Sequence, residues 1–167
     1  IKELCLTPTV EQIRLIKDGL FTVSRVDINE SWLLANKFEV LSWIRSAEQK
    51  IRLKHRGTGQ FKGDTLYWGK GSTRWFLKCY SKGEEINSKK STFPDALRTP
   101  EMLSYADRAL RLELTMKSNA LRELHLHIPA NWNAETAKML LLNSIKGLEM
   151  SNNFSLSNEV LSILPLP

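Results

Sequence analysis

A single tyrosine lies among cations in the stretch Arg74–Glu85, RWFLKCYSKGEE. If this stretch is extended, alternate side chains share a face, so Tyr80 lies beside Lys78 and Lys82, with Arg74 further along. A phenol in that setting could attack a phosphodiester as a nucleophile, while the cations offset the negative charge that grows on the phosphate oxygens. The alternative is a solvated strand face on which the tyrosine merely covers its neighbours.

Two further segments alternate in the same manner and add carboxylates. They are 21–29 (FTVSRVDIN) and 109–117 (ALRLELTMK), and each carries its ionisable groups on one face: Arg25 with Asp27, and Arg111 with Glu113. If these strands and the tyrosine strand pair in one antiparallel sheet with their charged faces on the same side, Asp27, Glu113 and Tyr80 converge. The alternative is a set of cross-strand salt bridges on a solvent face.

Converging carboxylates from different strands would form an all-oxygen site, which suits Mg²⁺ or Mn²⁺. The expected ligands are Asp27 and Glu113, with Glu85 or Glu84 from the turn after the tyrosine strand as a third. The arginines two positions before Asp27 and Glu113 would orient those carboxylates or bind phosphate.

A basic segment precedes the tyrosine strand. In IRLKHRGTGQFKGD, residues 51–64, alternating cations give way to glycines, which predicts an edge strand and a mobile basic loop. Such a loop suits a nucleic-acid backbone, although a charged edge also prevents strand aggregation. The cations expected to contact nucleic acid are Arg25, Arg52, Lys54, Arg56, Arg74, Lys78 and Arg111. Tyr67, Trp68 and Trp75 are candidate stacking surfaces, although Trp75 is expected first of all in the core.

The element pattern predicts an α+β fold, with a central antiparallel sheet and helices packed mainly on one face. We expect a hairpin of Thr65–Trp68 with the tyrosine strand, and helices from Thr7-Pro8 to Gly19, over 31–50, from Thr99 to about Asp107, from Ser118 to Leu124 and over 133–149. The 167 residues are expected to form a single domain. Because the chain starts without methionine and stops at LPLP, we expect a piece of a longer protein.

The net charge of +6 favours an anionic partner. Nucleic acid is the first expectation, an anionic membrane surface the second, and solubility alone the third. No run is long enough to span a bilayer, and the first residues do not read as a signal peptide. Cys5 and Cys79 show neither metal nor disulfide spacing, which favours a reducing cytosol, and Cys79 is expected to point into the core.

Four motifs occur in one order along residues 21–124: SRVD, TLYWGKGS, LKCYSKGEE and LRLELTMKS. This ordered set resembles the replication initiators of filamentous phages, of the gene II protein type, and the transferase-type Rep initiators of rolling-circle plasmids. Proteins of this kind are similar to HUH-type endonucleases, in which a tyrosine cuts one DNA strand at the origin and stays attached to the 5′ phosphate. The freed 3′ hydroxyl then primes synthesis. The longer phage proteins carry additional sequence before and after this region.

The resemblance implies a role for each motif residue. Tyr80 is the nucleophile, Lys82 lies beside it, and Glu85 matches the acid five residues on. Asp27 and Glu113 match the acids that hold Mg²⁺ or Mn²⁺. Lys82 is expected to lower the pKa of the phenol or to neutralise the charge of the transition state. The implied fold is HUH-endonuclease-like, the implied partners are single-stranded or supercoiled origin DNA and a host helicase, and the implied location is the bacterial cytoplasm.

The pair His125-Leu126-His127 fits a literal His-hydrophobic-His pattern, which could place two imidazoles on one face of a strand as metal ligands. The pair follows the tyrosine instead of preceding it, and it stands just before Pro129. We therefore favour a partly exposed pair on a loop over a pair of metal ligands. His55 is expected on a loop or an edge strand.

Two other functions stay open on the residues alone. A non-catalytic domain that binds single-stranded nucleic acid, or regulates, would keep the sheet for affinity, bind equally well in chelator and form no covalent adduct. A metal-dependent RNA nuclease without a covalent intermediate would cut its substrate but also form no adduct.

Overall fold

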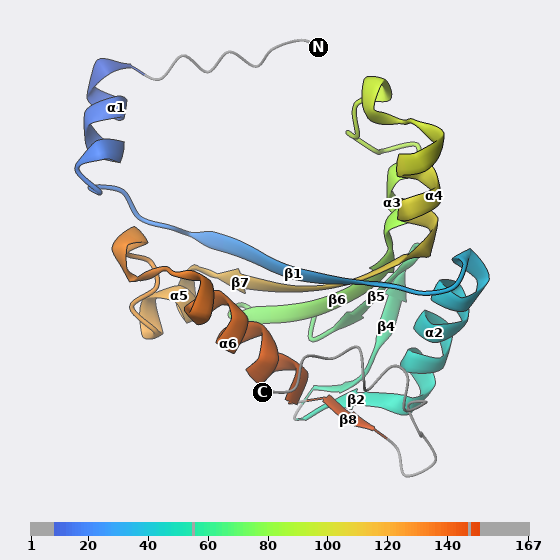
Figure 1. The fold of residues 1–167 in the computed structure, drawn as a ribbon. Coiled ribbons are helices and arrows are strands. Elements are labelled where there is room, and N and C mark those ends of the chain that lie inside the picture. The colour runs from blue at the N-terminus through green and yellow to red at the C-terminus, as the bar shows by residue number, and fades with distance from the viewer. Residues whose placement is uncertain (1–8, 55, 147, 151–167) are drawn as a thin grey trace.

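A five-stranded antiparallel sheet is the centre of the fold, in the order β1-β7-β6-β5-β4 (Figure 1). The computed structural model of the chain describes residues 9–54, 56–146 and 148–150. The central strands are β1 (Arg25–Leu33), β4 (Gln60–Lys62), β5 (Thr65–Trp68), β6 (Trp75–Ser81) and β7 (Ala109–Lys117). A smaller sheet has the order β3-β2-β8 and consists of β3 (Gly57–Thr58), β2 (Ile51–Leu53) and β8 (Leu148–Met150).

Helices cover mainly one face of the central sheet, and the first helix of the chain stands apart from it (Figure 1). They are α1 (Val10–Lys17), α2 (Lys37–Lys50), α3 (Lys82–Asn87), α4 (Pro100–Arg108), α5 (Ser118–Glu123) and α6 (Ala134–Lys146). Two 3₁₀ turns lie at Asp95–Leu97 and Pro129–Asn131. Buried residues of α2, α5 and α6 belong to the same core as one face of the strands, whereas α3 and α4 stand at one end of the sheet (Figure 1). The expected α+β architecture is confirmed and is compatible with an HUH-endonuclease-like arrangement.

Strand β7 organises the core because its residues alternate so regularly. Leu110, Leu112, Leu114 and Met116 are all buried on the helix-covered face, which we call the apolar face. Neighbouring β6 adds Leu77 and Cys79, both without exposed surface, so the expected inward position of Cys79 is confirmed. Burial also raises the pKa of the Cys79 thiol, which therefore stays protonated.

The first strand starts and ends later than its hydrophobic pattern suggested. It pairs with β7 along its whole length, from Arg25 opposite Lys117 to Leu33 opposite Ala109. The segment 31–33 is therefore extended, and the prediction of a helix from residue 31 was wrong there. That helix begins only after Asn36, whose side chain accepts a hydrogen bond of 3.0 Å from the Glu39 amide.

The tyrosine strand is shorter than expected. It ends at Ser81, whose hydroxyl accepts a hydrogen bond of 3.3 Å from the Glu84 amide and so caps α3. Lys82 is therefore the first residue of a helix and not the last side chain of the strand face. The predicted Gly-Glu-Glu turn is the first turn of that helix.

The other helix ends lie within a few residues of the predicted positions. Thr99 caps α4 through a hydrogen bond of 3.2 Å from the Met102 amide, as expected. Ser118 was expected to cap α5, but it is the first helical residue, and the cap position is Lys117 without a side-chain bond. The last long helix ends at Lys146 instead of residue 149, because residues 148–150 pair with β2.

Some expectations fall on residues that the structure does not describe. The Thr7-Pro8 helix start, Cys5, His55 and the stretch that ends in LPLP lie outside the described residues. Within the described part of the chain around α1, Thr9 and Gln12 cap the helix reciprocally. In the part of the chain that the structure describes, no helix has the length and apolar character needed to cross a membrane.

Gly83 touches α4 so closely that a side chain has no room. A β-carbon at this position would lie 2.9 Å from the Cα of Asp107 and would overlap its carboxylate. We expect Gly83→Ala to lower the free energy of unfolding by about 1–3 kcal/mol, the usual cost of overpacking. Urea denaturation measures this change. Gly71→Ala is the control, because a β-carbon there meets nothing within 4 Å. Equal stabilities of the two variants would contradict the close contact of α3 with α4.

Candidate active site on the open sheet face

The register of the strands places the polar side chains in rows across one face of the sheet, which we call the polar face. The first row holds Ser31, Arg111, Tyr80, Thr65 and Lys62. The second row holds Asn29, Glu113, Lys78, Tyr67 and Gln60. The third row holds Asp27, Thr115 and Phe76. The expectation that Asp27, Glu113 and Tyr80 share one face is confirmed.

Glu113 lies at the centre of this face and binds two neighbours. The Tyr80 hydroxyl donates a hydrogen bond of 3.1 Å to its Oε2 atom, and the Lys78 ammonium lies 2.6 Å from its Oε1 atom. Glu113 is only 6% exposed and Tyr80 only 7%. A buried carboxylate without partners is costly in free energy. The contacts to Glu113 therefore also fix the positions of Tyr80 and Lys78.

The phenol of Tyr80 is protonated in this arrangement. Burial raises the pKa of Tyr80 above its ordinary value, and the charges of Glu113 and Glu85 raise it further. Arg111 is the cation that acts in the opposite direction. Lys82 forms an ion pair with Glu85, and its expected effect on the phenol stays a prediction.

Each of the three candidate metal-binding carboxylates already has a cation of its own. Arg25 binds both oxygens of Asp27, at 2.8 Å for the shortest contact. Although partial burial acts in the opposite direction, the hydrogen bonds from Arg25 hold the pKa of Asp27 below its ordinary value. Lys78 binds Glu113, and Lys82 binds Glu85.

The donor set fits a hard divalent ion only in part. Asp27 and Glu113 are diagonal neighbours on adjacent strands, with the Asn29 amide directly opposite Glu113 on the same face. Their oxygens are of the type that Mg²⁺ and Mn²⁺ prefer. Glu85, by contrast, comes from α3 on the far side of Tyr80. Among the described residues, no three His, Cys, Asp or Glu side chains gather closely enough to hold a metal.

The predicted nucleic-acid cations fall into two groups. Lys78 and Arg111 flank the phenol, and the Nε of Arg111 donates a hydrogen bond of 3.0 Å to Ser31. Arg25 also lies on the polar face, where it binds Asp27.

The other four cations lie outside the rows of the polar face, and their role in nucleic-acid binding stays a prediction. Arg52 belongs to β2 and Lys54 to the turn behind it, in the smaller sheet. Arg56 stacks on Trp75 at 4.6 Å from the ring centroid. Arg74 precedes β6, so the alternation of the strand does not fix its direction, and it forms an ion pair with Glu123 of α5.

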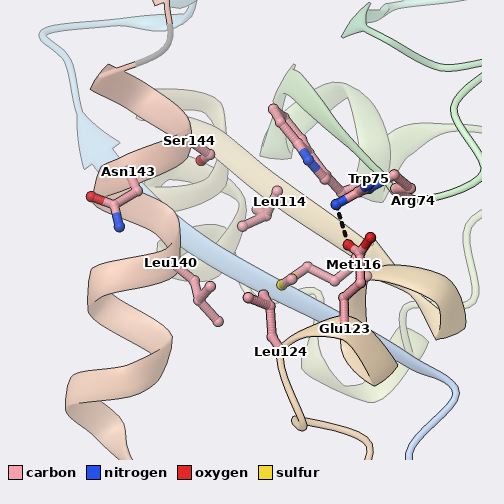
Figure 2. A pocket seen from close by; sticks show the side chains of 10 residues that line it. Arg74, Trp75, Leu114, Met116, Glu123, Leu124, Leu140, Asn143 and Ser144 are labelled. Carbon is pink, nitrogen blue, oxygen red and sulfur yellow. Dashed lines mark hydrogen bonds and ion pairs between the residues drawn. The ribbon is translucent and has the colours of Figure 1, made fainter.

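Arg74 thereby reaches a cavity on the apolar face, well away from the phenol. Figure 2 shows this cavity of about 200 Å³ between α5, α6 and the strands, with the Arg74–Glu123 ion pair at its edge. Its walls are mainly apolar and include Trp75, Leu114 and Leu140. The lining contains neither Tyr80 nor its hydrogen-bond partners, so the cavity is separate from the polar face.

The histidine pair lies in a turn and not on a strand. His125 and His127 follow α5, with ring centroids 6.4 Å apart, and His125 has a φ angle of 57°. The turn lies beyond Lys117, at the opposite end of β7 from Arg111. The expected loop position is confirmed, whereas any role in metal binding stays a prediction.

The expected stacking residues are partly corrected. Trp68 has no exposed surface, and its indole N–H donates to the Ile51 carbonyl at 3.2 Å, so it cannot stack on a ligand. Trp75 packs against the core, as expected. Phe76 shares the face of Tyr80, as the alternation of the tyrosine strand predicts, whereas Lys62 was expected in the basic loop and lies in β4. Their positions follow from the period of two in β4 and β6, once the hairpin register is known.

Taken together, the fold and the site define an α+β protein with a phenol, carboxylates and cations on an open sheet face, a class suited to phosphate-bearing ligands. The profile of a family described as the N-terminal part of the replication-associated gene II protein matches residues 1–135, so the chain belongs to this family. The expected kinship with gene II type initiators of filamentous phages is thereby confirmed.

One relative supports the same assignment. The replication-associated gene II protein of Enterobacteria phage I2-2 is 34% identical over 158 residues, which cover 93% of this chain and 46% of the relative. The chain therefore spans about half the length of that relative. No solved structure matches the chain.

The Lys78–Glu113 pair should contribute more to stability than the Lys82–Glu85 pair. The Glu113 side chain is 8% exposed, whereas that of Glu85 is 47% exposed. We expect Lys78→Met to lower the free energy of unfolding by about 3 kcal/mol, because it leaves a buried carboxylate without its cation. Lys82→Met is the matched control and should cost about 1 kcal/mol or less. Denaturant titration compares the two, and similar losses would contradict the central position of Glu113.

The raised pKa of Tyr80 predicts a loss of stability in alkali. Because the pKa in the folded protein lies above that of the unfolded chain, the contribution of the protonated phenol is fully present below about pH 10 and declines above it. The free energy of unfolding of the wild type should therefore fall more between about pH 8 and pH 11 than that of Tyr80→Phe. Parallel curves for the two proteins would show that the phenol is not perturbed.

Proposed function

We propose that this chain is the DNA-nicking region of a rolling-circle replication initiator. In this proposal it is a site-specific, metal-dependent endonuclease and strand transferase for single-stranded DNA, and it forms a 5′-phosphotyrosine at Tyr80. One observation carries the proposal: the phenol lies at the centre of the polar face, with its hydroxyl on Glu113 and with Arg111 and Lys78 beside it. Membership in the gene II protein family supports it.

The proposed reaction exchanges one phosphate ester for another. The Tyr80 oxygen forms a bond to phosphorus, the bond from phosphorus to the 3′ oxygen breaks, and that oxygen leaves and takes up a proton from solvent. The phenol proton passes toward Glu113, which already accepts its hydrogen bond. Because no phosphodiester bond is hydrolysed, the same steps in reverse rejoin the strand.

The protein keeps its nucleophile protonated until substrate is bound. The raised pKa of Tyr80 opposes phenolate formation at neutral pH. Arg111 is a cation whose charge favours the phenolate, and a phosphate approaching the polar face would also meet Lys78. Lys82, at the start of α3, is proposed to bind the attacked or the neighbouring phosphate from the other side.

Asp27 and Glu113 are the residues proposed to hold Mg²⁺ or Mn²⁺, with Glu85 as a third ligand. The ion, when bound, would supply positive charge to the phosphate oxygens. Glu113 is the residue at which two roles compete, because both of its oxygens already have partners in Lys78 and Tyr80. Both oxygens of Asp27 likewise already have a partner, which is Arg25.

The proposed partner is origin DNA, presented as a single strand or in supercoiled form, in the cytoplasm of a bacterial host and with a host helicase as a further partner. A second candidate function is supported by the burial of the phenol. A sheet face with a protonated tyrosine 7% exposed could also serve single-strand binding alone.

Covalent capture separates these functions. We expect the protein to form a denaturation-resistant adduct with labelled single-stranded origin DNA in Mn²⁺, and to lose it completely in chelator and in Tyr80→Phe. Tyr105→Phe is the matched control, because it removes a phenol hydroxyl from α4, where the side chain is 48% exposed, while the ring stays. It should retain adduct formation within about threefold, as an exchange that leaves the reacting atoms untouched.

Two results would overturn the proposal. An adduct that persists in Tyr80→Phe would place the nucleophile elsewhere. Tight DNA binding without any adduct, unchanged by chelator, would identify a binding domain instead of an enzyme.

A further inference from the structure

Two aromatic rings lie beside each other on the polar face, and one of them is a neighbour of the phenol. Tyr67 of β5 and Phe76 of β6 are half-buried, and their ring centroids are 6.0 Å apart at an angle of 47°. Tyr67 lies opposite Lys78, so it is the diagonal neighbour of Tyr80. Diagonal neighbours in an antiparallel pair are about 7–8 Å apart, which is close to the length of one extended nucleotide.

Lysines surround these rings. The Lys70 ammonium lies 4.1 Å from the Tyr67 ring centroid, and that of Lys117 lies 5.4 Å from the Phe76 centroid. Lys62 lies on the same face, at the row of Tyr80. Partial desolvation and the nearby charge of Lys62 lower the pKa of Lys70. In the described part of the chain, neither Lys62 nor Lys70 has a carboxylate within ion-pair distance.

This combination differs from the rest of the polar face. Around Tyr80 every candidate carboxylate has its own cation, and the further cation Arg111 donates a hydrogen bond to Ser31. Around Tyr67 the cations Lys62 and Lys70 lie close to each other, without an acid in ion-pair distance among the described residues, and the Lys70 ammonium lies over the Tyr67 ring. Unbalanced ammonium groups attract phosphates, and aromatic rings stack on unpaired bases of any sequence.

We propose that Tyr67 and Phe76 form a stacking platform for the unpaired bases next to the phosphate that Tyr80 attacks, with Lys62 and Lys70 on the adjacent phosphates. The ligand is single-stranded DNA, because bases in a duplex have no free face for the rings. This inference rests on the proposed function, and it adds to that function the path of the strand from the phenol toward the β4–β5 edge.

The rings also contact each other, so a purely structural role must be separated from binding. Tyr67→Leu and Phe76→Leu keep an apolar side chain but remove the flat π surface. Phe61→Leu is the matched control, because Phe61 is an aromatic residue of the same hairpin on the apolar face, opposite Leu66. Thermal unfolding of each variant shows whether the hairpin remains intact.

Fluorescence anisotropy with labelled oligothymidylate of about 12 nucleotides measures the affinity. All variants carry Tyr80→Phe and are measured in chelator, so that no covalent capture contributes. We expect Tyr67→Leu and Phe76→Leu each to weaken binding about 5- to 100-fold, the range for loss of one base–aromatic stack. Phe61→Leu should bind oligothymidylate with the affinity of the parent protein. Tyr67→Trp keeps a flat ring and should equal or exceed that affinity.

Salt dependence separates the rings from the lysines. The slope of log affinity against log salt should be unchanged in Tyr67→Leu, whereas Lys70→Gln should reduce it by about one unit because it removes one phosphate contact. A shallower slope in Tyr67→Leu would mean that the substitution disturbs the lysines and not a stack.

The outcomes distinguish this inference from the proposed function. If the protein with Tyr80 forms the adduct but both leucine variants bind oligothymidylate as the parent does, the platform is wrong and the nicking function stands. If the leucine variants lose affinity but no adduct ever forms, the platform stands and the nicking function falls. Tighter binding of oligouridylate than of oligothymidylate would overturn DNA as the ligand.

Discussion

The buried carboxylate of Glu113 is the constraint on which the polar face depends. A charge that is 6% exposed needs partners for both oxygens, and Lys78 and the Tyr80 hydroxyl supply them from the neighbouring strand. This places a phenol and an ammonium on either side of one acid. The same contacts that make the acid tolerable inside the protein therefore orient the residue that we propose as the nucleophile.

The two faces of the sheet divide stability from chemistry. On β7, leucines and a methionine fill the apolar face beneath α2, α5 and α6, while Arg111 and Glu113 stand on the other side of the same strand. A rigid, well-packed strand is a precise support for a site, because its side chains cannot shift without disturbing the core. Helix α3 adds Lys82 and Glu85 from the end of the sheet, where Gly83 lets it approach α4.

Charge is distributed unevenly along the polar face, and this gives the site a direction. Near the phenol each candidate carboxylate has a cation of its own, which suits a centre that we propose to control a proton and a metal. Near Tyr67 the lysines are unmatched, which suits a path for a nucleic-acid backbone. The cavity on the apolar face, with its Arg74–Glu123 pair, belongs to neither region (Figure 2).

The sequence by itself determined the alternation of β7, the hairpin before the tyrosine and the two-faced character of the sheet, because strand periodicity is local and fixes which side chains share a face. It could not determine that Ser81 ends the strand, which moved Lys82 into a helix. Nor could it show that Arg74 turns toward Glu123 or that Trp68 is fully buried. Register and ion-pair choice arise from contacts between residues far apart in the chain. Only the tertiary structure could therefore decide that Glu113 holds the phenol and that, among the residues it describes, the lysines beside Tyr67 have no acid to neutralise them.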